Sequence, residues 1–343
     1  MNAFTFWAGN YASAEEPGVL EYAFAPGTGF QLLRCISGLR TPSFVLENPA
    51  KGILYTVEEL SEGQVCAWDV RGSQPVLLSR LSTGGADPCH LALSDDGRWL
   101  YAANYTSGSV ACFALDANGN LLQRTDLRQH EGKGPNPLRQ EAPHAHCVFP
   151  VNEELLVCDL GLDAIFTYRN ENGSLREVHR LRLTPGCGPR HLAAHPKLGG
   201  MLYCITELAG TVVPLRLEAN GSLTALPAVA LLKEPMRPEW TGAAIHPLPA
   251  GSGLLLSLRG CDRLVFLPLG ADGTPGAPRC FPTVPVPRDF LLKDETLLVG
   301  SQQDGTLQAY SFAPEQGMIP LSWKTRMSSP VCLQIRQDGK MLS

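Results

Sequence analysis

Residues 88–119 read PCHLALSDDGRWLYAANYTSGSVACFALDANG, and they contain the pattern from which the rest of the chain is built. Three short apolar runs, which open after Pro88, at Trp99 and at Val110, are separated by polar segments rich in Asp, Asn and Gly. Asp-Gly and Asn-Gly pairs between apolar runs are typical of turns between antiparallel strands. A weaker fourth run follows, without helical periodicity. The stretch therefore predicts a four-stranded antiparallel sheet.

The same pattern recurs along the whole chain. The apolar runs that open the units follow seven anchor residues, and consecutive anchors are 43 to 55 residues apart. The anchors are Pro42, Pro88, Pro143, Pro189, Trp240, Pro287 and Pro330. Four-stranded repeats at about this period form the blades of β-propellers. We therefore predict an all-β, seven-bladed propeller of four-stranded antiparallel blades.

The two ends of the chain together supply the seventh blade. Residues 6–11 and 18–24 match residues 100–105 and 108–114, which are the second and third runs of a unit. The last anchor, Pro330, leaves room for one strand before the sequence ends. We expect the N-terminal strands to pair with the C-terminal strand, because a closed ring protects the sheet edges. Residues 1–343 would then form a single domain, interrupted by one long loop at 127–141.

Composition and charge argue against several classes of protein. The net charge of −5 argues against a nucleic-acid-binding or membrane-binding surface, and the chain lacks the run of about 18 apolar residues that a membrane span needs. The N-terminus has neither the basic nor the long apolar segment of a secretion signal. The eleven cysteines are scattered and mostly lie in apolar runs, which favours reduced thiols over a disulfide framework. We expect a cytoplasmic monomer or weak homodimer that binds a small molecule.

The propeller topology predicts where functional side chains gather. In a four-stranded meander, the innermost strand starts at the same face of the ring as the loop that follows the second strand. This face is termed the mouth face. Charged and polar residues stand at both kinds of position, so sequence-distant groups would meet there. Those at the anchors are His144, His146, Arg190, His191 and Arg288, and those that end second strands are Asn104, Asp159, Glu207, Arg259 and Gln303.

Several segments of the chain resemble a known family. Residues 134–146 read GPNPLRQEAPHAH and residues 188–192 read GPRHL, followed by Glu207 and by Arg259-Gly260. Nearly end to end, the chain resembles the seven-bladed propeller lactonases that include bacterial 6-phosphogluconolactonase and the fungal muconate-lactonizing enzymes. The resemblance implies hydrolysis of 6-phospho-D-glucono-1,5-lactone to 6-phosphogluconate, a step of the pentose phosphate pathway. It also implies a catalytic set of His146, Arg190, Glu207 and Arg259.

The chemistry of lactone opening suits these residue types. The reaction needs a deprotonated water, a stabilised oxyanion and a proton for the leaving ring oxygen. Because imidazole has a pKa of about 6.5, His146 is the favoured base, with Glu207 orienting it or sharing the proton. Arg190 would polarise the carbonyl, since a guanidinium donates hydrogen bonds but cannot act as a base. Arg259 and Arg139 would bind the phosphate, with Lys133 and Arg288 as reserves.

Other polar residues near the predicted mouth are expected to contact the substrate or to support the fold. We expect no cofactor. The family resemblance argues against a metal, and the sequence has no dense carboxylate cluster to bind calcium. His144 remains the alternative to His146 as the base. We interpret four other residues as structural: Asp159, Asp163, His90 and His191. The expected substrate-binding residues are Arg259, His144, Arg139, Gln140, Asn104, Tyr105, Arg288 and Gln303.

Two departures from the family pattern bear on the substrate. Ala244 stands where the family usually has an acid, and Leu258 stands where an Asn often precedes the Arg-Gly pair. Two other functions therefore stay open. One is a lyase or cycloisomerase that closes a lactone on an unsaturated dicarboxylate. The other is a non-catalytic propeller that binds a partner protein, since a fold alone does not determine a function.

Overall fold

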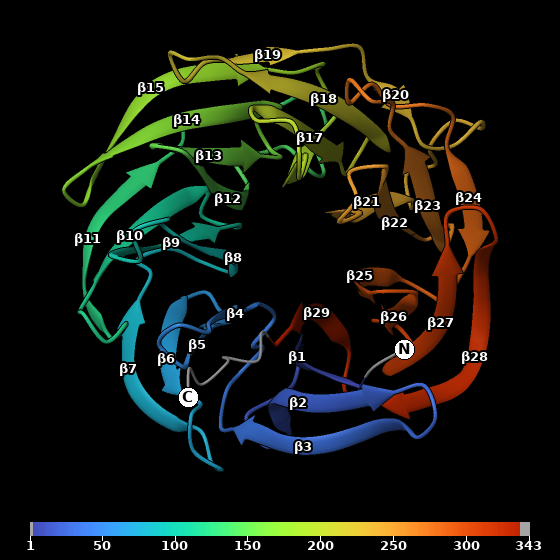
Figure 1. The fold of residues 1–343 in the computed structure, drawn as a ribbon. Coiled ribbons are helices and arrows are strands. Elements are labelled where there is room, and N and C mark those ends of the chain that lie inside the picture. The colour runs from blue at the N-terminus through green and yellow to red at the C-terminus, as the bar shows by residue number, and fades with distance from the viewer. Residues whose placement is uncertain (1–2, 337–343) are drawn as a thin grey trace.

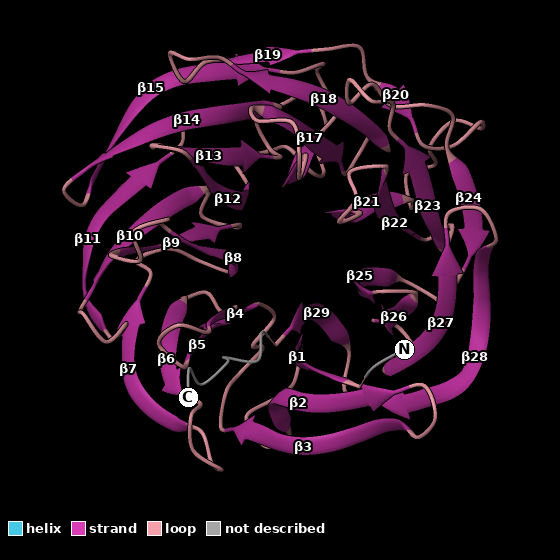
Figure 2. Cartoon of the chain, viewed as in Figure 1, coloured by secondary structure: helices cyan, strands magenta, loops and turns pink. Residues whose placement is uncertain are grey.

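The computed structural model describes residues 3–336, which form seven antiparallel sheets arranged in a ring around a central axis (Figure 1). Residues 1–2 and 337–343 of the expected domain lie outside the described residues. Strands and loops make up the whole described ring in Figure 2. The seven-bladed, all-β prediction is confirmed.

Each blade is a meander in which the chain runs outward from the axis. The innermost strands are β4 (Val45–Asn48), β8 (Pro88–Leu93), β12 (Ala145–Val151), β16 (Pro189–Ala194), β21 (Thr241–Pro247), β25 (Pro287–Lys293) and β29 (Pro330–Ile335). The second strands are β1 (Phe4–Asn10), β5 (Ile53–Glu58), β9 (Trp99–Asn104), β13 (Glu154–Asp159), β17 (Met201–Thr206), β22 (Gly253–Arg259) and β26 (Thr296–Ser301). Each predicted anchor opens an innermost strand or shortly precedes one.

The outer half of each blade completes the sheet. The third strands are β2 (Pro17–Ala25), β6 (Gln64–Asp69), β10 (Ser109–Leu115), β14 (Ala164–Glu171), β18 (Thr211–Leu217), β23 (Arg263–Pro268) and β27 (Thr306–Ala313). The outermost strands are β3 (Gly29–Ser37), β7 (Val76–Ser82), β11 (Leu121–Gln129), β15 (Ser174–Arg182), β19 (Leu223–Ala225), β24 (Arg279–Pro282) and β28 (Gly317–Arg326). A short strand, β20 (Val229–Ala230), also pairs with β18, so the outer edge of that blade is divided.

The hydrophobic core lies between neighbouring blades. Every residue of β13 is buried, whereas β7 at the outer edge has mostly exposed residues. Tyr55 and Val57 of one blade pack with Leu100 and Ala102 of the next. The second strands are buried on both faces because each is covered by a blade on either side. This explains their continuous apolar sequences, which differ from the alternation expected of a sheet that faces water on one side.

The ring closes as predicted. β29 pairs antiparallel with β1, with Cys332 opposite Gly9 and Leu333 opposite Ala8. Leu333 is 5% exposed and packs in a cluster with Phe6 of its own blade and Leu291 of the preceding blade. The C-terminal strand therefore completes both a sheet and the core on each side of it.

The cysteines do not form disulfides within the described residues. All eleven lie there as free thiols, and eight of them are buried. Most therefore behave as small apolar side chains of the core. Across residues 3–336, no helix has the length and apolar character needed to cross a membrane.

Closure of the ring by β29 makes a buried charge in this strand costly. We expect Leu333→Asp to lower the free energy of unfolding by about 3 kcal/mol or more, because it places a carboxylate in the core. Leu32→Asp is the control, since Leu32 is 51% exposed on the outer strand of the same blade and the change should stay within about 0.5 kcal/mol. Urea unfolding of both variants measures the difference. Equal effects would show that β29 is not part of the core.

Candidate active site

A β-bulge stands at the start of six of the seven innermost strands. In each, the register against the second strand shifts within the first residues, so that an extra residue is left between paired positions. Bulges redirect side chains and often lie beside active sites. The residues in the bulges are Cys89, His146, Arg190, Ala243, Ala244, Arg288, Asp289 and Val331. All except the two alanines line cavities on the axis.

A second repeated feature fixes the residue that follows the second strand. In five blades its backbone N–H donates to the carbonyl of the residue before the anchor proline of the same blade, at 2.7–3.4 Å. The acceptor always has a positive φ, which is uncommon for residues other than glycine. The donors are Tyr11, Glu59, Tyr105, Glu207 and Gln302, and the respective acceptors are Ser329, Thr41, Asp87, Gly188 and Val286. The mouth face is thus built from the same backbone contact in blade after blade.

These two kinds of position converge on a main cavity of about 230 Å³. Tyr11, Glu59, Tyr105 and Glu207 follow second strands, whereas Cys89, His146 and Arg288 come from bulges. Arg139 and Arg259 complete the lining of the cavity. Every one of the seven blades, or a loop leading into it, therefore contributes at least one side chain.

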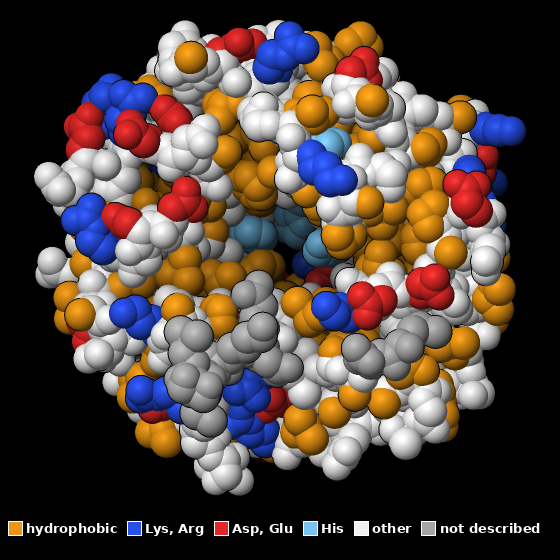
Figure 3. Space-filling model, in the orientation of Figure 1, with side chains coloured by type: hydrophobic (Ala, Val, Ile, Leu, Met, Phe, Trp, Pro, Cys, Tyr) orange, Lys and Arg blue, Asp and Glu red, His pale blue; other side chains and the backbone are white. Residues whose placement is uncertain are grey.

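Two further cavities continue along the axis. A small cavity of about 30 Å³ shares Glu59, Cys89, His146 and Arg288 with the main cavity. It also shares Phe44, His191 and Asp289 with a third cavity of about 440 Å³, which extends to the far ends of the innermost strands. His90, His191 and His246 line this third cavity. Figure 3 shows histidine side chains around the hollow at the centre of one face.

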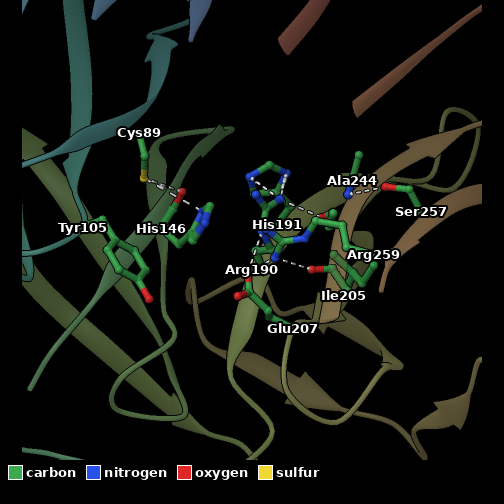
Figure 4. Close-up of polar contacts among 12 residues, drawn as sticks. Cys89, Tyr105, His146, Arg190, His191, Ile205, Glu207, Ala244, Ser257 and Arg259 are labelled. Atoms are coloured by element: carbon green, nitrogen blue, oxygen red, sulfur yellow. Dashed lines mark hydrogen bonds and ion pairs between the residues drawn. The ribbon is translucent and has the colours of Figure 1, made fainter. Parts of the chain in front are cut away.

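Glu207 connects three arginines of the axis. Its Oε2 lies 2.8 Å from Arg190 Nε and 3.0 Å from Arg259 Nη2 (Figure 4). Its Oε1 accepts a hydrogen bond from Arg139. Burial alone would raise the pKa of Glu207, but the guanidiniums of Arg259 and Arg190 lower it below the usual range. Glu207 is therefore a permanent anion that positions three cations.

The backbone of β21 fixes two of these arginines. Arg190 Nη1 donates to the carbonyl of Ala243 at 2.7 Å, and Arg259 Nη2 lies 3.3 Å from the carbonyl of Gly242. Burial lowers the pKa of Arg259 to about 10, with further repulsion from Arg288 and Arg190. The group stays charged at neutral pH, and another anion nearby would relieve the repulsion.

Arg288 has no carboxylate within ion-pair distance among residues 3–336. Its guanidinium lies over the ring of Tyr11, 5.3 Å from the centroid. With Arg139, Arg190 and Arg259 it makes four cations around three carboxylates, Glu207, Glu59 and Asp289. The axis is therefore locally positive in a chain whose net charge is −5, which favours an anionic ligand.

His146 is held edge-on to two rings. Its ring centroid lies 5.4 Å from that of Tyr105 and 5.1 Å from that of His191 (Figure 4). Burial lowers the pKa of His146 well below its usual value, and the nearby Arg190 adds to this effect. The imidazole is thus neutral at pH 7 and has a free lone pair for a proton.

The structure places the predicted site residues in two groups. Those that line the main or the small cavity are His146, Glu207, Arg190, Arg259, Arg139, Arg288 and Tyr105. The expected substrate contacts His144, Gln140, Asn104 and Gln303 lie outside both linings, as does the reserve residue Lys133.

The residues outside the cavities mostly support loops. The Gln140 amide donates to the Leu160 carbonyl and to Asp163, and the Asn104 amide donates to Ser109. His144 stacks on Tyr105 with ring centroids 4.5 Å apart. His144 therefore packs against Tyr105, which lines the main cavity, without lining the cavity itself.

Gln303 and Lys133 are exposed. Asp159 and Asp163, which were interpreted as structural, accept backbone N–H groups of the loops around them.

Sequence reasoning missed three residues of the main cavity: Tyr11, Glu59 and Cys89. Tyr11 and Glu59 occupy the position that Tyr105 and Glu207 occupy in other blades, and Cys89 occupies the bulge position of His146 and Arg190. Alignment of the repeats residue by residue would have identified all three.

The positions that depart from the family pattern are buried away from the cavities. Ala244 is 2% exposed and its N–H donates to Ser257 (Figure 4), while Leu258 packs in an interblade cluster. Neither lines the main or the small cavity. Within residues 3–336, no three or more His, Cys, Asp or Glu side chains are grouped so that they could hold a metal ion.

Comparison with known proteins agrees with this geometry. Residues 5–335 match the family model of the lactonases with a seven-bladed β-propeller, so the chain belongs to this family. Among relatives of known name, it is similar to the 6-phosphogluconolactonase of Bacillus subtilis, with 29% identity over 97% of this chain and 99% of the relative. It is also similar to the 6-phosphogluconolactonase of Formosa agariphila, with 27% identity over 86% of this chain and 91% of the relative.

Solved structures show the same likeness over the full length. The periplasmic gluconolactonase of Pseudomonas aeruginosa superimposes with a TM-score of 0.89 and 26% identity, over 98% of this chain and 99% of that chain. A protein from Lactobacillus plantarum superimposes with a TM-score of 0.90 and 26% identity, over 98% of this chain and 100% of that chain.

The contacts of Glu207 predict a large loss of stability when its charge is removed. Glu207→Gln keeps the shape but leaves three arginines without their buried counter-ion, which should lower the free energy of unfolding by about 3–5 kcal/mol. Urea unfolding measures this loss. The exposed Glu315→Gln is the control and should change stability by less than about 0.5 kcal/mol. A Glu207→Gln variant as stable as the control would contradict the role of Glu207 as a counter-ion.

Proposed function

We propose that this chain hydrolyses a sugar lactone, and that its substrate is 6-phospho-D-glucono-1,5-lactone, which it converts to 6-phosphogluconate. The observation that carries the proposal is the buried Glu207, ion-paired with three arginines, beside the neutral His146 on the axis, where these five side chains line the main cavity or the small cavity that adjoins it. The names of the relatives from Bacillus subtilis and Formosa agariphila support the phosphorylated substrate. We further infer that the protein acts in the cytoplasm, which suits its free thiols.

Arg190 and Arg259 are suited to stabilise the oxyanion of the tetrahedral intermediate. Both are oriented by Glu207 and by backbone carbonyls of β21, so their donors are fixed before the substrate arrives. Such preorganised donors are worth about 10²–10³-fold in rate when they face the developing charge.

Arg139 and Arg288 are suited to bind the phosphate. Arg139 comes from the long loop that precedes β12, and Arg288 has a positive charge that no described carboxylate pairs. A guanidinium binds phosphate through two parallel hydrogen bonds, which would orient the lactone ring toward the axis.

His146 is suited to orient the attacking water. As a neutral imidazole it accepts a hydrogen bond from the water and so directs the water oxygen at the carbonyl carbon. Glu207 supports this step as a fixed charge and carries no proton itself, because its pKa lies far below neutral pH under the influence of the arginines.

A direct assay tests the substrate and the reaction together. We expect the wild type to open the phosphorylated δ-lactone well above the spontaneous background and the unphosphorylated lactone more slowly. Arg259→Ala and His146→Ala should each lower kcat/KM by about 10²-fold or more, with folding intact by circular dichroism.

The alternative reactions give different results in the same experiment. Turnover of an unsaturated dicarboxylate without lactone hydrolysis would favour the cycloisomerase, which could use the same arginines. Turnover of neither compound would overturn the enzyme proposal and leave a non-catalytic binding propeller.

A further inference from the structure

Glu59 is a carboxylate of the axis that no ion pair neutralises among the described residues. It lines both the main and the small cavity, as His146 does. The Tyr11 hydroxyl donates to Glu59 Oε1 at 3.2 Å. Glu59 Oε2 is buried and has no hydrogen-bond partner in residues 3–336. Buried carboxylate oxygens without a partner are rare, so this atom points to a ligand.

The small cavity beside Glu59 has the size and the lining for a water molecule. Its volume of about 30 Å³ exceeds the roughly 10–15 Å³ that one water needs. The Ser43 hydroxyl, which also lines this cavity, is a second buried oxygen without a hydrogen-bond partner. Together with His146 and the guanidiniums of Arg190 and Arg288, these atoms offer a water the two to four polar partners that it requires.

The backbone of Glu59 is fixed by a strained residue. Its N–H donates to the Thr41 carbonyl at 3.1 Å, and its own carbonyl accepts from Thr41 Oγ1 at 2.7 Å. Thr41 has a φ of 45°, which a β-branched residue rarely adopts. Strain of this kind persists where the surrounding structure requires one geometry, and it is concentrated at functional sites.

The environment of Glu59 differs from that of Glu207. Burial raises the pKa of Glu59, whereas the guanidiniums around Glu207 lower the pKa of that carboxyl. A carboxylate with a raised pKa holds a proton more firmly than an ordinary one and can still release it. His146 is a weaker acceptor, because burial and Arg190 oppose its charged form.

We propose that the small cavity binds the attacking water and that Glu59 is a further catalytic residue, the group that holds the proton of this water between attack and ring opening. The inference rests on the proposed lactonase function. The water oxygen forms a bond to the carbonyl carbon, and an O–H bond of the water breaks as its proton passes to Glu59 Oε2. When the oxyanion collapses, the bond from carbon to ring oxygen breaks and Glu59 returns the proton to that oxygen. The product is the hydroxy acid, which then ionises in solution.

Replacement of the Glu59 carboxylate by an amide of the same size tests the proposal. Glu59→Gln keeps the size of the side chain but cannot carry the proton, so kcat should fall by about 100-fold or more while KM stays within about threefold. Glu62→Gln is the matched control, because Glu62 lies in the same loop, is exposed and is outside both cavities. Its kcat should equal that of the wild type.

Chemical rescue separates proton transfer from a structural role. Glu59→Ala makes room for a small carboxylate, and formate should restore its kcat by about tenfold or more in a saturable manner. Formate should have no effect on Glu59→Gln, which fills the space. A Glu59→Gln variant with wild-type kcat, or a folded Glu59→Ala variant that formate does not rescue, would overturn the inference. A wild type that opens no lactone would instead overturn the proposed function, and the inference with it.

Discussion

The pairing of β29 with β1 is the interaction on which the rest of the structure depends. The nine side chains that line the main cavity come from all seven blades or the loops leading into them, and no single blade supplies more than two of them. An open ring would lose the interblade core around β29 as well as the geometry around the axis. The antiparallel ladder between the two ends of the chain therefore fixes the distance between residues such as Tyr11 and Glu207, which are far apart in the sequence. The pairing of β29 with β1 therefore contributes both to the stability of the fold and to the arrangement of the site.

Two repeated backbone features turn a regular ring into a site. The bulges at the starts of innermost strands direct one or two side chains toward the axis, and the hydrogen bonds to residues of positive φ fix the loops after the second strands. Neither feature depends on which side chain the position carries. The blade of β21 has the bulge but places Ala243 there, whose carbonyl instead binds Arg190. The fold thus offers a set of equivalent positions, and the chemistry depends on which of them carry functional groups.

The sequence predicted the ring and its closure, because turn residues and apolar runs repeat with one period. It also predicted the mouth face and most cavity-lining residues, but it did not resolve neighbouring positions. Asn104 is the last residue of its strand and its amide contacts Ser109, whereas Tyr105, one residue later, lines the cavity. Likewise, Glu58 is the last residue of its strand and pairs with Arg80, whereas Glu59, one residue later, lines the cavity. Successive residues of a strand face opposite sides, and a bulge shifts this alternation by one. The pattern of apolar runs therefore did not indicate which of two adjacent residues faces the axis, and only a residue-by-residue alignment of the repeats would separate them.

Glu59 and Glu207 show how one repeated position can serve two chemical roles. Both follow a second strand, and both donate their backbone N–H to a residue of positive φ. Glu207 is paired with three guanidiniums and stays ionised, whereas the pKa of Glu59 is raised by burial, which outweighs the opposing influence of Ser43, Arg288 and Tyr11. Two carboxyl groups whose surroundings move their pKa values in opposite directions are suited to different tasks, one as a fixed charge and the other as a carrier of protons. The difference arises from the side chains around each carboxylate, since three arginines surround Glu207 while the backbone N–H groups of the two residues make the same contact.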